Sequence, residues 1–131
     1  MKRFKEAWII DDNWLDVFGI KRLMKHVGFS EKILTYSDGY EALNELTLIA
    51  KQDADKCPDV ILLDIKMPDW DGWRFLDFFV ELGLQKKTEL YLISTSILET
   101  DITKANRYDV ISQCYEKPIN QVHLKEIMQS E

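Results

Sequence analysis

The chain has 131 residues, the length of one compact domain, and its 46% apolar and 31% charged residues are an ordinary globular composition. Acidic residues outnumber basic ones by 23 to 17, and the net charge of −6 argues against direct binding to nucleic acid. No apolar run approaches the roughly 20 residues of a membrane helix, and no signal peptide fits the N-terminus. We therefore expect a cytoplasmic protein without membrane contact. Cys57 and Cys114 lie too far apart in sequence to suggest a zinc motif or a disulfide framework.

Short apolar runs alternate with stretches of helical periodicity along the whole chain. Five runs predict strands, at residues 8–10, 33–36, 60–63, 90–93 and 114–115. The alternation is typical of βα units that form a parallel sheet. With right-handed crossovers, the sequence predicts a single-domain α/β fold, a (βα)5 doubly wound parallel sheet that binds ligands at the carboxyl ends of its strands.

The segments between these runs carry apolar residues at spacings of three and four, which predicts five helices packed on the sheet. Asp38 and Ser96 each precede a Glu by three residues and are expected to cap helices, as is Asn120. The residues expected to face the core are Val17, Ile20, Met24 and Val27, then Ala42, Leu43, Leu46, Ile49 and Ala50, then Phe75, Leu76, Phe79 and Leu82, then Leu98, Ile102 and Ala105, and finally Leu124, Ile127 and Met128.

Three carboxylates stand at the ends of two predicted strands. Asp11 and Asp12 follow the first strand, and Asp64 follows the third. A single aspartate at such a place more often caps a loop or a helix. Three of them at two neighbouring strand ends repel one another unless a cation is present, and oxygen ligands of this kind suit Mg²⁺.

The fourth and fifth strands end in a different set of polar side chains. Ser94, Thr95 and Ser96 follow the fourth strand, and Lys117 with Pro118 follows the fifth. A Lys-Pro pair after a strand favours an unusual loop, with a cis bond as one option. Together, carboxylates, a metal, a hydroxyl and an ammonium form a set suited to phosphoryl chemistry.

The stretch 63–72 reads LDIKMPDWDG, and with Asp11-Asp12, Ser94-Thr95-Ser96 and Lys117-Pro118 it resembles the receiver domain of two-component response regulators. The spacing of 30 residues from Asp64 to Ser94 is the one that this family uses. The resemblance covers almost the whole chain and implies a flavodoxin-like strand order, 2-1-3-4-5. It also implies a receiver domain over residues 6–129, preceded by a short extension at residues 1–5.

The resemblance implies a role for each residue at the strand ends. Asp64 corresponds to the phosphoacceptor, Ser94 to the switch hydroxyl and Lys117 to the lysine that contacts the phosphoryl group. Side chains two positions beyond the phosphoacceptor and the hydroxyl tune the phosphoryl lifetime in this family, and here they are Lys66 and Ser96. The implied Mg²⁺ ligands are Asp11, Asp12, Asp64 and the backbone carbonyl of Lys66.

We therefore expect a stand-alone response regulator and not an enzyme with its own substrate. A sensor histidine kinase or a histidine phosphotransfer protein would supply the phosphoryl group, a protein partner would receive the output, and the chain would be a monomer or a phosphorylation-dependent dimer. One alternative is a receiver-like docking module that works without phosphorylation. A less favoured alternative is a Mg²⁺-dependent phosphohydrolase with an aspartate nucleophile, which would need an Asp where Lys66 stands and a cap domain.

Two departures from the family pattern concern the fifth strand. The position three before Lys117, commonly Tyr or Phe, is Cys114, while Tyr115 falls on the opposite face of the strand. The spacing from Ser94 to Lys117 is 23 residues, one more than usual. We expect the extra residue in the loop at 109–112, and we expect switching through an aromatic ring to be altered.

Overall fold

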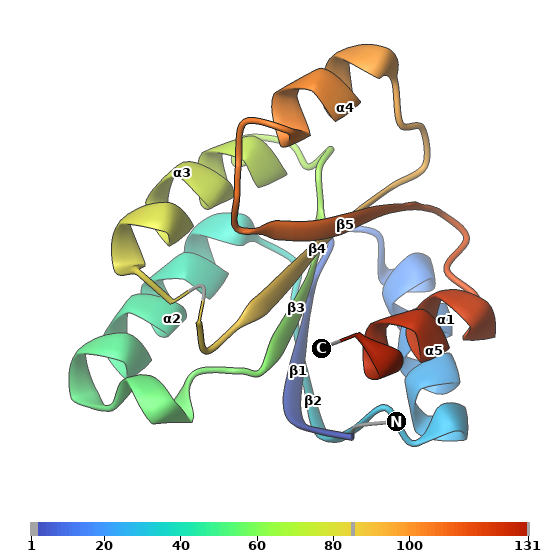
Figure 1. Cartoon of the computed structure of the whole chain (residues 1–131), viewed down its shortest axis with the longest axis horizontal. Coiled ribbons are helices and arrows are strands. Elements are labelled where there is room, and N and C mark those ends of the chain that lie inside the picture. The colour runs from blue at the N-terminus through green and yellow to red at the C-terminus, as the bar shows by residue number, and fades with distance from the viewer. Residues whose placement is uncertain (1–2, 85, 131) are drawn as a thin grey trace.

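The computed structural model describes residues 3–84 and 86–130, in which strands and helices alternate. The strands are β1 (Phe4–Ile10), β2 (Ser30–Tyr36), β3 (Val60–Asp64), β4 (Glu89–Ser94) and β5 (Ile111–Glu116). The helices are α1 (Trp14–Val27), α2 (Gly39–Gln52), α3 (Gly72–Leu82), α4 (Glu99–Ala105) and α5 (Gln121–Gln129), with one 3-10 turn at Ala54–Lys56. The strands pair in parallel in the order β2-β1-β3-β4-β5 (Figure 1), which confirms the predicted fold class and strand order.

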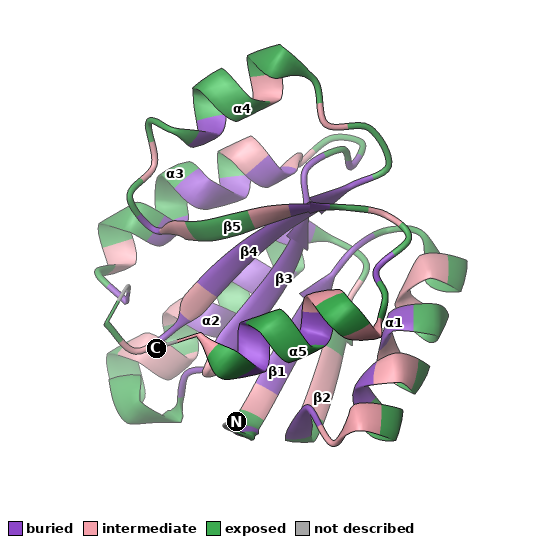
Figure 2. Cartoon of the chain, turned by 45° about the vertical axis from the view of Figure 1, so that its right-hand side comes forward, coloured by how far each residue is buried: buried purple, intermediate pink, exposed green. Residues whose placement is uncertain are grey.

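Two hydrophobic clusters hold the sheet between its helices. Side chains alternate across the sheet, so Trp8 and Leu63 pack with Phe79 on the α2 and α3 side, whereas Ile9 packs with Met24 on the α1 and α5 side. β3 is buried along its whole length (Figure 2), as its continuous apolar run predicts. The central strands therefore form a rigid platform whose carboxyl ends share one edge.

The helix starts follow the predicted caps in two cases, and a third cap was not predicted. The side chains of Asp38 and Asn120 accept backbone N–H bonds at the starts of α2 and α5. Asn13 does the same at the start of α1, where its side-chain oxygen accepts from the N–H groups of Leu15 and Asp16. Within the described parts of the chain, no helix is both long and apolar enough to cross a membrane.

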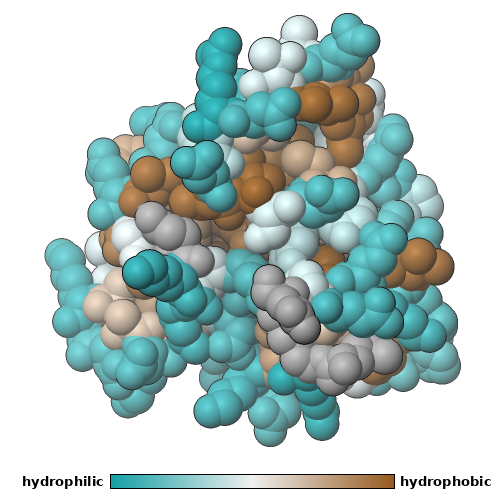
Figure 3. All heavy atoms as spheres, viewed as in Figure 1, coloured by the Kyte–Doolittle hydropathy of each residue, from teal (hydrophilic) through white to brown (hydrophobic). Residues whose placement is uncertain are grey.

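The fourth helix differs from its prediction. α4 begins at Glu99 and not beside Ser96, because the N–H of Leu98 donates to the carboxylate of Asp101. Leu98 and Ile102 are 54% and 49% exposed, so of the predicted stripe only Ala105 faces the core as expected. The helix has only seven residues, and Tyr108 and Val110 pack against the core beside Ala105. Figure 3 shows apolar atoms gathered over α3 and α4 in the upper part of this face.

The start of β1 and the course of β5 add two details. β1 begins at Phe4, so the strand includes part of the segment 1–5, while the boundary of the domain stays a prediction.

In β5 the register moves from Leu90 opposite Ile111 to Tyr91 opposite Gln113. The extra residue is therefore Ser112, which lies in the predicted window but forms a bulge inside the strand instead of lengthening a loop.

Cys114, at the position where the family commonly has an aromatic residue, and its neighbour Tyr115 face opposite sides of the sheet, as expected. Cys114 is half-buried on the side of α3, where it packs against the first hydrophobic cluster. Tyr115 is buried on the side of α5, and its hydroxyl donates to Glu126 at 3.1 Å. The aromatic ring is thus anchored on the far side of the sheet from Cys114.

Candidate functional site

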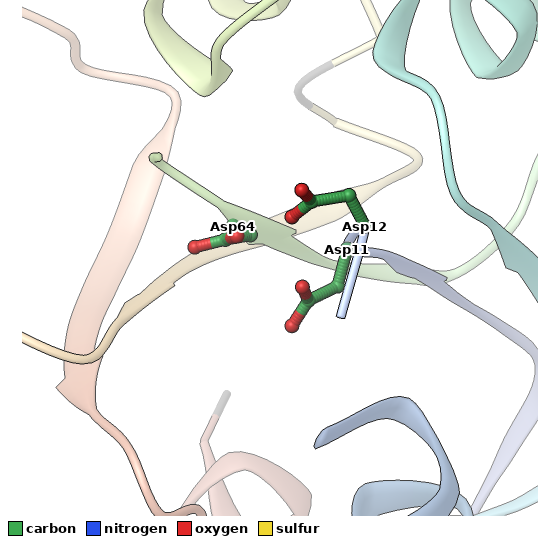
Figure 4. A group of neighbouring side chains, drawn as sticks. All are labelled: Asp11, Asp12 and Asp64. Atoms are coloured by element: carbon green, nitrogen blue, oxygen red, sulfur yellow. The ribbon is translucent and has the colours of Figure 1, made fainter. Parts of the chain in front are cut away.

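Three carboxylates meet at the carboxyl edge of the sheet. Asp11 follows β1 directly, Asp12 comes next, and Asp64 is the last residue of β3. One oxygen from each lies within 4.8 Å of the others, and Figure 4 shows the three side chains reaching into the same space. Asp11 and Asp64 are 1% and 4% exposed, whereas Asp12 faces solvent. The predicted acidic cluster therefore forms, and it suits a hard divalent cation.

Local hydrogen bonds hold these carboxylates in place. The N–H of Asp11 donates to the carbonyl of Tyr36 on β2 at 3.0 Å, and the N–H of Asn13 donates to a carboxylate oxygen of Asp11 at 2.9 Å. This second bond turns the chain from β1 into α1. The N–H of Lys66 donates to Asp64 at 3.3 Å. Each buried aspartate is thus oriented by a backbone donor two residues later.

A glycine lets α3 start directly against the end of β3. A Cβ at Gly72 would lie 2.7 Å from the carbonyl oxygen of Asp64 and 2.9 Å from the Cα of Ile65, closer than side chains permit. The N–H of Gly72 instead donates to the carbonyl of Ile65 at 2.9 Å. The glycine of the sequence motif is therefore required by close backbone approach beside Asp64.

Lys117 is the buried cation of the site. Its Nζ lies 2.6 Å from Asp11, 3.0 Å from Asp16 and 3.7 Å from Asp64, and its side chain is only 6% exposed. Its backbone N–H donates to the carbonyl of Ser94 at 2.7 Å, and the bond to Pro118 is cis. The ends of β1, β3, β4 and β5 therefore converge on this ammonium.

Burial shapes the electrostatics of the cluster. It raises the pKa of Asp64 to about 7, with a further rise from the neighbouring Asp11 and a partial offset from Lys117. Burial alone would lower the pKa of Lys117, but its contacts with Asp11 and Asp16 outweigh burial and raise the pKa. The lysine thus stays charged, while Asp64 is poorly compensated unless more positive charge enters the site.

Ser94 and Lys66 share one acceptor. The hydroxyl of Ser94 is fully buried and donates to the carbonyl of Ser96 at 3.0 Å. The ammonium of Lys66 donates to the same carbonyl, also at 3.0 Å. The loops after β3 and β4 are therefore tied together at Ser96. The hydroxyl predicted to act at this site is engaged within its own loop.

The acidic cluster opens into a cleft of about 460 Å³. Its lining residues are Asp12, Asn13, Trp14, Asp16, Asp64, Lys66, Thr95 and Lys117. A larger and more apolar groove of about 650 Å³ lies alongside, between α1 and the loop after β5. Asp16 and Lys117 line both spaces, so their ion pair forms part of the wall between them.

Asp16 is the site residue that sequence reasoning missed. It lies 101 residues from Lys117 along the chain, and an acid in the first turn of a helix is an ordinary feature. Only the packing of α1 beside the end of β5 brings the two together. In the sequence only the spacing of four residues from Asp12 to Asp16 pointed to this contact, and that signal is weak.

Comparisons with known proteins agree with this geometry. The family model of the response regulator receiver domain matches residues 7–129. The chain belongs to this family. Among curated relatives, the sensor histidine kinase CheAY of Helicobacter pylori is 32% identical over 92 residues, or 70% of this chain. The chain spans only 11% of the length of that relative.

Solved receiver structures share the fold closely. A two-component response regulator from Cytophaga hutchinsonii superposes with a TM-score of 0.87 at 25% identity and covers 96% of this chain and 95% of its own. The phosphorylated cyanobacterial phytochrome response regulator RcpA gives a TM-score of 0.75 at 26% identity, over 95% of this chain and 89% of its own. The receiver fold therefore extends over nearly the whole chain.

Proposed function

We propose that this receiver accepts a phosphoryl group on Asp64 in a Mg²⁺-dependent reaction. The observation that carries the proposal is the environment of Asp64, which has two carboxylates within 4.8 Å and the ammonium of Lys117 at 3.7 Å. Asp64 lines an open cleft, and the negative charge of the neighbouring carboxylates favours binding of a cation there. The phosphorylated state named for RcpA supports the same chemistry in a receiver of similar sequence.

The donor would be a phosphohistidine on a sensor kinase or a phosphotransfer protein. An oxygen of Asp64 forms a bond to phosphorus while the P–N bond of the donor breaks. The electron pair of that bond returns to the imidazole nitrogen, which takes a proton from solvent. The product is an acyl phosphate on Asp64 and a neutral histidine, and later attack by water returns the carboxylate and inorganic phosphate.

The acidic cluster fits the cation that this reaction needs. The structure brings together the carboxylates of Asp11, Asp12 and Asp64. The family resemblance adds the backbone carbonyl of Lys66 as a candidate ligand, and all four are oxygens, as Mg²⁺ prefers. Bound there, Mg²⁺ supplies positive charge that neutralises the oxygens of the phosphoryl group during transfer.

The remaining roles belong to the chain's own side chains. Lys117 binds one phosphoryl oxygen as a charged donor. The hydroxyl of Ser94 breaks its hydrogen bond to the carbonyl of Ser96 and donates to a second phosphoryl oxygen. This change moves the loop after β4 and alters the surface offered to a partner. With Cys114 at the aromatic position, this loop movement proceeds without a tyrosine or phenylalanine ring there.

The identity of the partners follows from this chemistry. CheAY is named a sensor histidine kinase, and its similarity supports a kinase or phosphotransfer protein as the donor. The output partner would be a protein that recognises the phosphorylated surface, with the chain acting in the cytoplasm as a monomer or a phosphorylation-dependent dimer. The chain would act as a switch and not as an enzyme with its own substrate.

Intact-protein mass spectrometry after incubation with acetyl phosphate and Mg²⁺ tests the proposal. We expect one added phosphoryl group on the wild-type chain, none on Asp64→Asn, and normal labelling of Asp109→Asn, which removes an exposed acid elsewhere. Labelling of Asp64→Asn would contradict the assignment. A folded wild-type chain that binds Mg²⁺ but neither gains the group nor releases inorganic phosphate from the donor would favour a docking module instead.

A further inference from the structure

Asp16 connects α1 to the candidate phosphorylation site. Its carboxylate lies 3.0 Å from Nζ of Lys117, while its own N–H is held by the side chain of Asn13 at the start of the helix. The first turn of α1 therefore aims this carboxylate at the site. Asp16 is not a member of the acidic cluster formed by Asp11, Asp12 and Asp64.

The ammonium of Lys117 is held from two sides. An ammonium has three protons to donate, and Nζ of Lys117 donates one of them to Asp16 at 3.0 Å, while its contact with Asp11 at 2.6 Å is an ion pair. The contact to Asp64 is longer, at 3.7 Å, so the head group stands beside Asp64 without closing on it. The ammonium therefore has donors left for an oxygen attached to Asp64.

The two holding carboxylates differ in what else they do. Asp11 belongs to the acidic cluster, so a cation in the cluster draws on the same carboxylate that contacts Lys117. Asp16 lies outside the cluster, in the first turn of α1, and its side chain is 31% exposed. A cation held by the cluster therefore does not draw on the carboxylate of Asp16.

We propose that Asp16 is a positioning residue that holds the ammonium of Lys117 in place to receive a phosphoryl oxygen on Asp64. This inference rests on the proposed function. Asp16 forms no bond to phosphorus and exchanges no proton. It keeps its charge, Lys117 keeps its three protons, and the incoming phosphoryl oxygen accepts the donor that faces Asp64. Holding a charged donor in advance is an effective way to favour a phosphoryl group in transfer.

A purely electrostatic role would predict the reverse effect. Asp16 adds negative charge near an anionic donor, so its removal would speed phosphorylation if repulsion dominated. Asparagine separates the two roles, because its amide oxygen still accepts a hydrogen bond from Lys117 but carries no charge. Positioning predicts that Asn retains most of the rate and Ala does not, whereas repulsion predicts that both variants gain equally.

The first experiment measures the rate of phosphorylation by acetyl phosphate at saturating Mg²⁺. We expect Asp16→Ala to be about tenfold slower than wild type and Asp16→Asn to remain within about threefold, since hydrogen bonds with a charged acceptor are about twice as strong as neutral ones. Glu99→Gln is the matched control, because it removes an exposed acid from the first turn of α4. Rates for Asp16→Ala at or above the wild-type value would overturn the inference.

A double-mutant cycle tests whether Asp16 acts through Lys117. In a Lys117→Met background, Asp16→Ala is expected to leave the remaining rate unchanged, because the group it positions is gone. An undiminished effect of Asp16→Ala in that background would refute a positioning role. If Asp64→Asn also gains the group, the proposed function itself fails, so the two failures are distinguishable.

A readout without phosphorylation completes the test. In the metal-free protein, the ¹H–¹⁵N signal of the Lys117 ammonium should be sharp in wild type and in Asp16→Asn, because hydrogen bonding slows the exchange of its protons. It should broaden in Asp16→Ala while the thermal unfolding curve stays cooperative. An equally sharp signal in Asp16→Ala would contradict the inference, and rescue by Asn excludes a general loss of folding.

Discussion

The two ends of β3 carry aspartates in opposite situations. Asp59 precedes the strand, and one of its oxygens accepts the N–H groups of Lys5 and Glu6 while the other lies 2.7 Å from Lys87. Burial alone would raise the pKa of Asp59, but these donors outweigh burial and lower it. At the other end, burial and Asp11 raise the pKa of Asp64 to about 7.

The difference separates stability from function within a single strand. At its amino end the fold satisfies a carboxylate with nearby donors and so gains stability. At its carboxyl end the fold assembles acids that repel one another and leaves the compensating charge to be supplied from outside. A region whose charges repel one another and would be compensated by a ligand is a candidate binding site, whereas a region with satisfied charges is part of the scaffold.

The largest expected effect on stability is at the amino end of β3, where the carboxylate of Asp59 has its hydrogen-bond donors. Asp59→Ala should lower the free energy of unfolding by about 2 to 3 kcal/mol, because two backbone donors and Lys87 lose their acceptor. Since the folded pKa is lowered, this stabilisation is present above pH 4 and lost as the pH falls through the folded pKa. Urea unfolding at pH 7 and pH 3 measures both, and an unchanged midpoint at pH 7 would remove the contrast.

The next effect has the opposite sign. In metal-free protein at pH 8, Asp64→Asn should raise the free energy of unfolding by about 2 kcal/mol, because it removes a carboxylate whose folded pKa is about 7. Between pH 4 and pH 7 the folded wild type holds a proton that the unfolded chain does not. Wild-type stability should therefore fall relative to the variant as the pH rises through this window.

Magnesium should reverse this second difference. A cation that binds only the folded wild-type site stabilises it by mass action, so the advantage of Asp64→Asn should shrink as Mg²⁺ is added. Thermal unfolding at a series of Mg²⁺ concentrations measures this. A wild-type midpoint that does not move with Mg²⁺ would argue against a cation site at the cluster.

Substitutions of Lys66 and Lys87, at opposite ends of β3, should have opposite patterns of effect on stability and on phosphoryl lifetime. Lys66→Ala should leave stability within about 0.5 kcal/mol, because Lys66 is exposed, and should shorten the phosphoryl lifetime roughly threefold by opening the cleft to water. Lys87→Ala should lower stability by about 1 kcal/mol and leave the lifetime unchanged. Dephosphorylation rates and urea midpoints of both variants test this, and equal lifetimes for Lys66→Ala and wild type would oppose it.

The smallest expected effect on stability is that of an exposed lysine, Lys32. Lys32 lies at the amino end of the sheet near Glu6, but its side chain is 63% exposed and the contact is 3.8 Å long. Lys32→Ala should therefore change the free energy of unfolding by less than about 0.5 kcal/mol. A larger loss in urea unfolding would mean that charge in general, rather than satisfied buried charge, stabilises this end.

Much of the fold could be predicted from sequence because its signals are local. The run at 60–63 has no polar residue and predicted a buried strand, and the position of Asp64 at its end followed from the same pattern. The convergence of Asp11, Asp12 and Asp64 required only that β1 and β3 be neighbours, which right-handed topology favours.

What sequence could not predict depends on contacts between distant segments. The carboxylate of Asp16 reaches Lys117 through the packing of α1, and the ammonium of Lys66 reaches the carbonyl of Ser96 across two loops. The start of α4 was mistaken because Ser96 and Asp101 compete as local cap signals. The hydroxyl of Ser94 donates to the carbonyl of Ser96, so these residues form a turn and the helix starts after Leu98.

The bulge in β5 bears on how this protein behaves at high concentration. β5 is the last strand of the sheet, so its outer edge presents backbone groups to which a strand from another copy could add. The displaced Ser112 interrupts the regular ladder, and Ser112, Gln113 and Glu116 expose polar side chains along the strand. A neighbouring copy therefore meets a kinked, polar strand at β5, which protects this edge of the sheet against the addition of further strands.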